Sequence, residues 1–177
     1  MPDLTTNPEK PLRLFYALWP DDATRDALAH WQETVRGRKI NRRNLHLTLA
    51  FLGQQPAASV PVLQEILMLL PPTDMTLMLD RAGYFPRAKI AWACMQVAPD
   101  ALTGLYRALL QELTQRNIAF DQANFTPHVT LAREATAPPD SSFTPIRWHV
   151  TQVALMQSVT TPEGTFYHAL ASRTLSP

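Results

Sequence analysis

His46-Leu47-Thr48-Leu49 returns later in the chain as His128-Val129-Thr130-Leu131, and each copy lies within an apolar run, over residues 45–52 and 125–132. Side chains alternate between the two faces of a β-strand. Each copy therefore predicts a strand that buries two aliphatic side chains and presents a histidine and a threonine on the opposite face. A single copy is weak evidence, because histidines often fill half-buried strand positions. Two matching copies in 177 residues favour a shared functional site.

The elements around the two copies follow one another in the same order. Apolar spacing predicts a strand over 12–18 and a helix over 22–36 before the first His-x-Thr strand. It predicts a strand over 89–97 and a helix over 99–116 before the second, which we place at 126–132. A duplicated β-α-β unit would bring the two His-x-Thr faces together across a cleft, about a pseudo-twofold axis.

The remaining segments favour antiparallel pairing. We expect a helix over 57–70, a strand over 75–82 and a turn at 83–86. One long strand or two strands should follow over 146–159, and a last strand over 165–172. Hairpins over 75–97 and 146–172 do not suit a doubly wound parallel sheet. The predicted fold is α+β and bilobal, with mostly antiparallel sheets flanking a central cleft and helices outside. We treat residues 1–177 as one domain of two intertwined lobes, each contributing one His-x-Thr strand.

Composition narrows the classes of function. The chain is 46% hydrophobic and 18% charged, which is typical of a soluble globular protein. A net charge of +1 excludes a polyanion-binding tail, so any nucleic-acid contact must come from a local patch. The single Cys94 excludes an internal disulfide and a cysteine-rich zinc site. Without an 18-residue apolar run or a secretory signal, we expect no membrane contact and a cytoplasmic location.

A basic cluster precedes the first His-x-Thr strand and consists of Arg36, Arg38, Lys39, Arg42 and Arg43. Such a cluster is commonly a solvated loop that aids solubility. Because this one leads directly into a candidate site, we also consider a role in phosphate binding. Arg42 and Arg43 are the candidate contacts with a nucleic acid.

Paired histidines suit phosphodiester chemistry. Histidine titrates near neutral pH, so one imidazole can accept a proton while the other donates one to the departing oxygen. Thr48 and Thr130 can donate hydrogen bonds to the non-bridging oxygens, and Arg133, which ends the second strand, can neutralise the developing charge. A zinc site needs three or four ligands, and neither motif contains an acidic residue, so we predict no metal and no cofactor. His149-Val150-Thr151-Gln152 is a third His-x-Thr, but it lacks the aliphatic fourth residue and is taken as a chance match.

The two motifs, the continuation Ala132-Arg133 and the opening residues 13–18 resemble the 2H phosphoesterase superfamily, most closely its bacterial RNA 2′,3′-cyclic phosphodiesterase branch, formerly named 2′–5′ RNA ligase. The resemblance covers residues 12 to about 172. It implies a bilobal fold and metal-independent hydrolysis of RNA 2′,3′-cyclic phosphate ends to 2′-phosphomonoesters. It also implies that His46 is the proton donor and His128 the proton acceptor, with Thr48, Thr130 and Arg133 binding phosphate. The residues alone do not rank the two histidines.

Three other readings stay open at this point. The same residues could catalyse the reverse reaction, in which a 5′-hydroxyl end is joined by a 2′–5′ bond. A small cyclic nucleotide could be the substrate. From a different class, the chain could be a non-catalytic RNA-binding module that uses the basic cluster. For the enzyme, we expect a monomer acting on RNA with a 2′,3′-cyclic phosphate end, with tRNA fragments among the candidate substrates.

Overall fold

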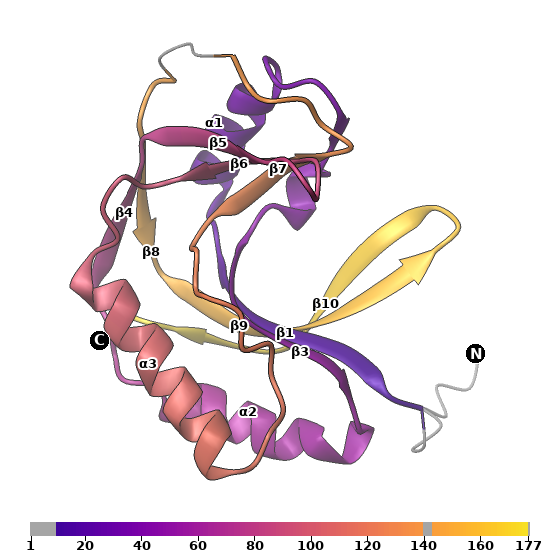
Figure 1. Ribbon diagram of the computed structural model, residues 1–177. Coiled ribbons are helices and arrows are strands. Elements are labelled where there is room, and N and C mark those ends of the chain that lie inside the picture. The colour runs from indigo at the N-terminus through magenta and orange to yellow at the C-terminus, as the bar shows by residue number, and fades with distance from the viewer. Residues whose placement is uncertain (1–9, 140–142, 177) are drawn as a thin grey trace.

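A computed structural model describes residues 10–139 and 143–176. Within them, the main sheet has the strand order β10-β9-β1-β3-β7-β6-β5, every pair of neighbours is antiparallel, and β2 also pairs with β7 (Figure 1). Its strands are β1 (Leu12–Trp19), β2 (Arg38–Lys39), β3 (Leu47–Gln55), β5 (Arg81–Phe85), β6 (Ile90–Cys94), β7 (Val129–Arg133), β9 (Gln152–Thr161) and β10 (Gly164–Thr174). A second sheet pairs β4 (Met75–Leu79) with β8 (Ile146–Val150). The α+β, mostly antiparallel prediction is confirmed.

The helices lie outside the sheets (Figure 1). They are α1 (Asp22–Gln32), α2 (Val60–Leu69) and α3 (Asp100–Gln115), with short 3₁₀ turns at Arg42–Asn44 and Ala57–Ser59. Helix α1 packs on β7 and β8, whereas α2 packs on β9, β10 and α3. In both halves of the chain, the strand before a helix pairs with the His-x-Thr strand after it, β1 with β3 and β6 with β7. This connectivity matches the predicted repeat, whereas the division into two lobes stays a prediction.

The first helix is shorter than its apolar spacing predicted. It begins after Asp21, whose carboxylate accepts a hydrogen bond from the Thr24 N–H at 2.8 Å, but it ends at Gln32 rather than at residue 36. The Gln32 side chain donates to the backbone oxygens of Ile40 and Leu131, each at 2.8 Å, and so joins the helix end to the loop and to β7. Gly37 is therefore not a helix cap, and its φ of 137° belongs to the following loop.

The prediction for residues 75–97 was wrong in its pairing. Residues 75–82 form no single strand, because the chain passes from the small sheet to the large one at Asp80. There the Asp80 N–H donates to the Cys94 oxygen at 3.0 Å, and the Asp80 carboxylate accepts from the Gln96 N–H at 2.9 Å. Residues 83–85, expected in a turn, belong to β5, and β4 pairs with the distant β8 instead of with β6.

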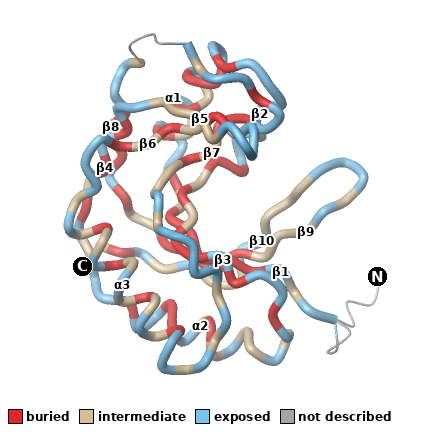
Figure 2. Tube along the Cα trace, viewed as in Figure 1, coloured by how far each residue is buried: buried red, intermediate tan, exposed pale blue. Residues whose placement is uncertain are grey.

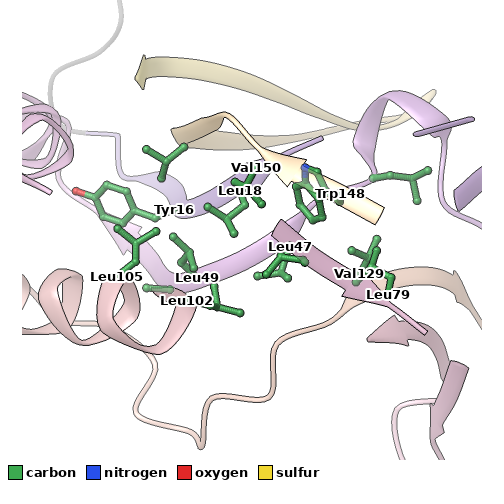
Figure 3. Close-up of a cluster of buried hydrophobic side chains, with 14 of the residues drawn as sticks. Tyr16, Leu18, Leu47, Leu49, Leu79, Leu102, Leu105, Val129, Trp148 and Val150 are labelled. Atoms are coloured by element: carbon green, nitrogen blue, oxygen red, sulfur yellow. The ribbon is translucent and has the colours of Figure 1, made fainter. Parts of the chain in front are cut away.

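Alternation along the central strands separates the core from the opposite face of the sheet. On β1, Leu14, Tyr16 and Leu18 are buried in the main core, and Figure 3 shows Tyr16 and Leu18 among side chains from β3 and α3. The aliphatic residues of both motifs lie in the same core, and Figure 3 shows Leu47 and Val129 there. Figure 2 shows buried segments along β3 and β7. Phe15 and Ala17 point to the other face, where they pack with Ala154 and Met156.

Candidate active site

The two His-x-Thr motifs meet at the centre of the main sheet. Leu47 on β3 lies opposite Val129 on β7, and each histidine immediately precedes its strand. Because the strands are antiparallel, this register places His46 across from Thr130, and Thr48 across from His128. Since these residues alternate with the buried Leu47 and Val129, all four face away from the core. The structure therefore brings together the residues predicted as a catalytic pair with two threonines.

Both histidines use Nδ1 in the same way. His46 Nδ1 lies 2.6 Å from the Asn44 oxygen, and His128 Nδ1 lies 2.7 Å from the Thr126 oxygen. A backbone oxygen only accepts hydrogen bonds, so each Nδ1 carries a hydrogen and each neutral ring keeps its lone pair on Nε2. In His46 this Nε2 lies 2.9 Å from Thr48 Oγ1, whose hydroxyl donates to it. The Nε2 atoms are thus the ones able to exchange protons.

Aromatic rings surround His46. Trp19 stacks on it at 5.4 Å between centroids, Tyr167 meets it edge-on at 5.2 Å, and Phe15 lies tilted at 5.0 Å. Burial among these rings lowers the pKa of His46 to about 4. The nearby His128 and Arg133 lower this pKa further, while the hydrogen bond to Asn44 opposes the shift. His46 is therefore neutral at pH 7.

His128 has a more open environment. Phe85 meets its ring edge-on at 5.2 Å, and burial lowers its pKa below the usual value. The hydrogen bond to Thr126 opposes this shift, whereas the charge of Arg133 reinforces it. The positive charge of Arg133 thus lowers the pKa of both histidines. Arg133 itself is exposed at the end of β7, and no carboxylate pairs with it among the described residues.

The basic cluster divides into paired and unpaired residues. Arg42 Nε lies 2.7 Å from an Asp26 carboxylate oxygen, and its Nη2 lies 3.5 Å from that of Asp22, so α1 already neutralises this charge. By contrast, the Arg43 guanidinium lies over the ring of Phe166, 4.4 Å from the centroid, with no carboxylate paired to it in the described part of the chain. Of the two predicted RNA contacts, Arg43 is the better placed to bind a phosphate.

Sequence reasoning missed the aromatic residues around the site. Phe15 and Trp19 lie on the opposite face of β1 from the core residues Leu14, Tyr16 and Leu18, an arrangement that period-2 spacing could have revealed. Phe51 gave no such signal, because strict alternation from His46 would place it on the buried face. Register shifts between β1 and β3 change the alternation, and Phe51 lies opposite Phe15 with 49% of its surface exposed. An exposed ring next to the face that carries the two histidines can stack on a nucleobase.

Other features predicted from the sequence lie apart from this site. The third His-x-Thr is on the small sheet, where His149 Nε2 lies 2.9 Å from an Asp74 carboxylate oxygen. Over residues 10–139 and 143–176, no three or more His, Cys, Asp or Glu residues gather as a metal site would require. In the same ranges, no helix has both the length and the apolarity needed to cross a membrane.

Known proteins with similar sequences are cyclic phosphodiesterases. The chain is 33% identical over 138 residues to the RNA 2′,3′-cyclic phosphodiesterase of Escherichia coli K12, covering 73% of this chain and 78% of that protein. It is 34% identical over 178 residues to the RNA 2′,3′-cyclic phosphodiesterase of Thermus thermophilus, covering 90% of this chain and 88% of that protein.

Solved structures and a family model agree with these relatives. Apo E. coli LigT superposes with a TM-score of 0.80 at 29% identity, over 96% of this chain and all of that one. LigT complexed with 3′-AMP gives a TM-score of 0.81 at 29% identity, over 95% of this chain and all of that one. The model of the 2′-5′ RNA ligase superfamily matches residues 20–162. The chain belongs to the 2′-5′ RNA ligase superfamily.

Proposed function

We propose that this protein hydrolyses RNA 2′,3′-cyclic phosphate ends to 2′-phosphomonoesters without a metal ion. The observation that carries the proposal is the register of Leu47 opposite Val129, which sets two histidines and two threonines on one face of the sheet. The activity agrees with that named for the E. coli and T. thermophilus relatives. LigT structures include one with 3′-AMP, a ribonucleotide that carries its phosphate on a ribose hydroxyl oxygen.

The proposed reaction is an in-line displacement at phosphorus. His128 Nε2 removes a proton from water, and the water oxygen forms a bond to phosphorus. The bond between phosphorus and the ribose O3′ breaks, and His46 Nε2 donates a proton to that oxygen. The product keeps its phosphate on O2′, and the two histidines end with their protonation states exchanged. The hydrogen bonds from His46 Nδ1 to the Asn44 oxygen and from His128 Nδ1 to the Thr126 oxygen orient both rings for these proton transfers.

The proton on His46 depends on the substrate in this proposal. A pKa of about 4 leaves too little imidazolium at pH 7 for an effective acid. A bound phosphodiester brings a negative charge next to Nε2, which raises the pKa of His46 and favours proton uptake. His46 therefore acquires its proton as the substrate binds. The assignment of His46 as donor and His128 as acceptor follows the family resemblance.

The non-bridging oxygens carry the charge that grows in the transition state. We assign their binding to Thr48, Thr130 and Arg133. Thr48 must turn its hydroxyl from His46 Nε2 to the phosphate, a rotation that also frees Nε2 for the substrate. Arg133 has an exposed guanidinium whose N–H groups can bind two phosphate oxygens at once.

One chain supplies all five of these residues, so we propose that the protein acts as a monomer. An RNA substrate is consistent with a cytoplasmic location. We keep tRNA fragments among the candidate RNAs. The candidate RNA contacts are Arg43 and, once released from Asp22 and Asp26, Arg42.

The test is hydrolysis of a short RNA with a 2′,3′-cyclic phosphate end in the presence of excess chelator, with identification of the product phosphate. Wild type should form the 2′-phosphate, and His46→Ala and His128→Ala should each lose at least about 10²-fold in rate. His149→Ala is the matched control, because it removes the third His-x-Thr histidine on a different sheet and should keep full activity. Full activity of either site variant, or a need for metal, would overturn the proposal.

Two alternatives give different results in the same assay. Joining would appear as a longer RNA with a 2′–5′ bond when an RNA with a 5′-hydroxyl end is added, since the acid and base exchange roles in reverse. A non-catalytic binding module would retain RNA without turnover. It would lose affinity on changes in the basic cluster rather than at the histidines.

A further inference from the structure

A cavity of about 460 Å³ lies beside His46, over the surface of β9 and β10. This volume falls in the range of about 300–1,000 Å³ that is usual for small-molecule sites. Ala154, Ala169 and Met156 form the apolar part of its lining, and the two alanines are small enough to leave the space open. Three aromatic residues also line it, namely Trp19, Phe166 and Tyr167. The cavity therefore combines an apolar interior with rings on which a nucleobase could stack.

The cavity shares three lining residues with His46. Trp19 stacks on the imidazole, Tyr167 meets it edge-on, and the Asn44 oxygen accepts the hydrogen bond from Nδ1. A ligand in the cavity would therefore contact the immediate neighbours of the proposed proton donor. This position is close enough to the reacting phosphate for the same RNA to occupy both sites.

Arg43 gives the cavity a positive charge. Its guanidinium lies over Phe166, and in the described part of the chain no carboxylate neutralises it, whereas Asp22 and Asp26 neutralise the neighbouring Arg42. A free guanidinium next to aromatic rings matches the two parts of a nucleotide, because it binds phosphate while the rings contact the base. In an RNA substrate, the nearest additional anion is the phosphodiester on the 5′ side of the terminal nucleoside.

We propose that this cavity is a second nucleotide subsite, which holds the nucleotide immediately upstream of the cyclic phosphate end. Arg43 binds the phosphodiester that joins the last two nucleosides, and the upstream base stacks on the aromatic wall. The protein then distinguishes an RNA end from a free nucleoside cyclic phosphate. This inference rests on the proposed function, whose reaction it uses as the readout.

The test compares adenosine 2′,3′-cyclic phosphate with the dinucleotide ApA that ends in a 2′,3′-cyclic phosphate. Wild type should show a kcat/KM about 10- to 100-fold higher for the dinucleotide, the usual effect of a hydrogen bond to a charged group. Arg43→Ala should abolish most of this preference. Ala169→Trp, which places a large side chain in the cavity from an exposed position, should also abolish it. Arg147→Ala, an exposed arginine on β8, is the control for net charge and should keep the preference.

The outcomes separate this inference from the proposed function. If wild type hydrolyses both substrates with equal kcat/KM, or if Arg43→Ala and Ala169→Trp keep the preference, the second subsite is wrong and the cyclic phosphodiesterase activity stands. If Arg147→Ala reduces the preference as much as Arg43→Ala does, the effect is general electrostatics and the subsite is again wrong. If wild type hydrolyses neither substrate, the proposed function itself fails.

Discussion

Asn44 connects His46 to the β9–β10 hairpin. Its backbone oxygen accepts the hydrogen bond from His46 Nδ1 at 2.6 Å, and its side-chain Nδ2 donates to the Thr165 oxygen on β10 at 2.9 Å. Asn44 is buried, with 8% of its surface exposed, so neither contact is easily replaced by water. The orientation of the proposed acid thus depends on a strand that is distant in sequence.

The first prediction concerns this connection. Asn44→Asp keeps the shape of the side chain but replaces the donor with an acceptor, which leaves the Thr165 oxygen without its partner. We expect a loss of about 1–3 kcal/mol in the free energy of unfolding, measured by urea denaturation, together with a lower kcat. Asn124→Asp, at an exposed loop position, introduces the same chemical change and should alter neither quantity. Equal stability of the two variants would contradict the structural role of Asn44.

The second prediction is a dependence of stability on pH. The pKa of His46 is about 4 in the folded state and about 6.5 in the unfolded state. Between these two pH values the unfolded chain therefore binds more protons than the folded chain. Stability should therefore fall as pH drops from about 6.5 to about 4, by up to about 3 kcal/mol from this residue. The lowered pKa of His128 acts in the same direction.

Urea denaturation of wild type and His46→Asn at pH 7 and pH 5 measures the effect. The free energy of unfolding should change less between pH 7 and pH 5 in the variant than in wild type, since the substituted side chain does not titrate. Between pH 7 and pH 9 the two proteins should differ by a constant amount. If the free energy of unfolding changes equally in both proteins between pH 7 and pH 5, burial among the aromatic rings does not lower the pKa of His46.

The third prediction concerns Arg133. Arg133→Ala should lower kcat/KM for a cyclic phosphate RNA by about 10²–10³-fold, because in the proposed mechanism it removes a group that donates hydrogen bonds to the developing charge. Arg133→Lys should recover part of the lost kcat/KM, since lysine keeps the positive charge but cannot form bidentate hydrogen bonds. In Arg133→Ala the pKa values of both histidines should rise, because the positive charge that lowers them is gone. NMR titration of the imidazoles measures this shift, and unchanged pKa values would place Arg133 outside the site.

The fourth prediction uses two glycines. At Gly37 the φ is 137°, and an added Cβ would lie 2.7 Å from Ala135 Cα and 2.9 Å from the Arg133 oxygen. Gly37→Ala should destabilise the protein by roughly 1–3 kcal/mol and, if Arg133 binds phosphate as proposed, lower the activity as well. Gly104→Ala, in helix α3 with open space around the added Cβ, should instead stabilise by about 1 kcal/mol. Thermal unfolding of the two variants should shift in opposite directions.

The residues that do the proposed chemistry were evident in the sequence because strand alternation is local. Two copies of His-x-Thr in apolar runs predicted which side chains share a face, and the α+β class followed from the order of the elements. Helices α2 and α3 were also predictable, because each presents a continuous apolar face; Leu63, Ile66 and Leu67 form that of α2.

Contacts between distant segments were decided only by the tertiary structure. The register of Leu47 opposite Val129, the pairing of β4 with β8, and the rings of Trp19 and Tyr167 around His46 each join segments far apart in the chain. Local periodicity carries no information about such partners, because register and packing depend on the whole buried surface. For the same reason, the sequence showed Arg42 and Arg43 as equivalent, and the acids of α1 neutralise only Arg42.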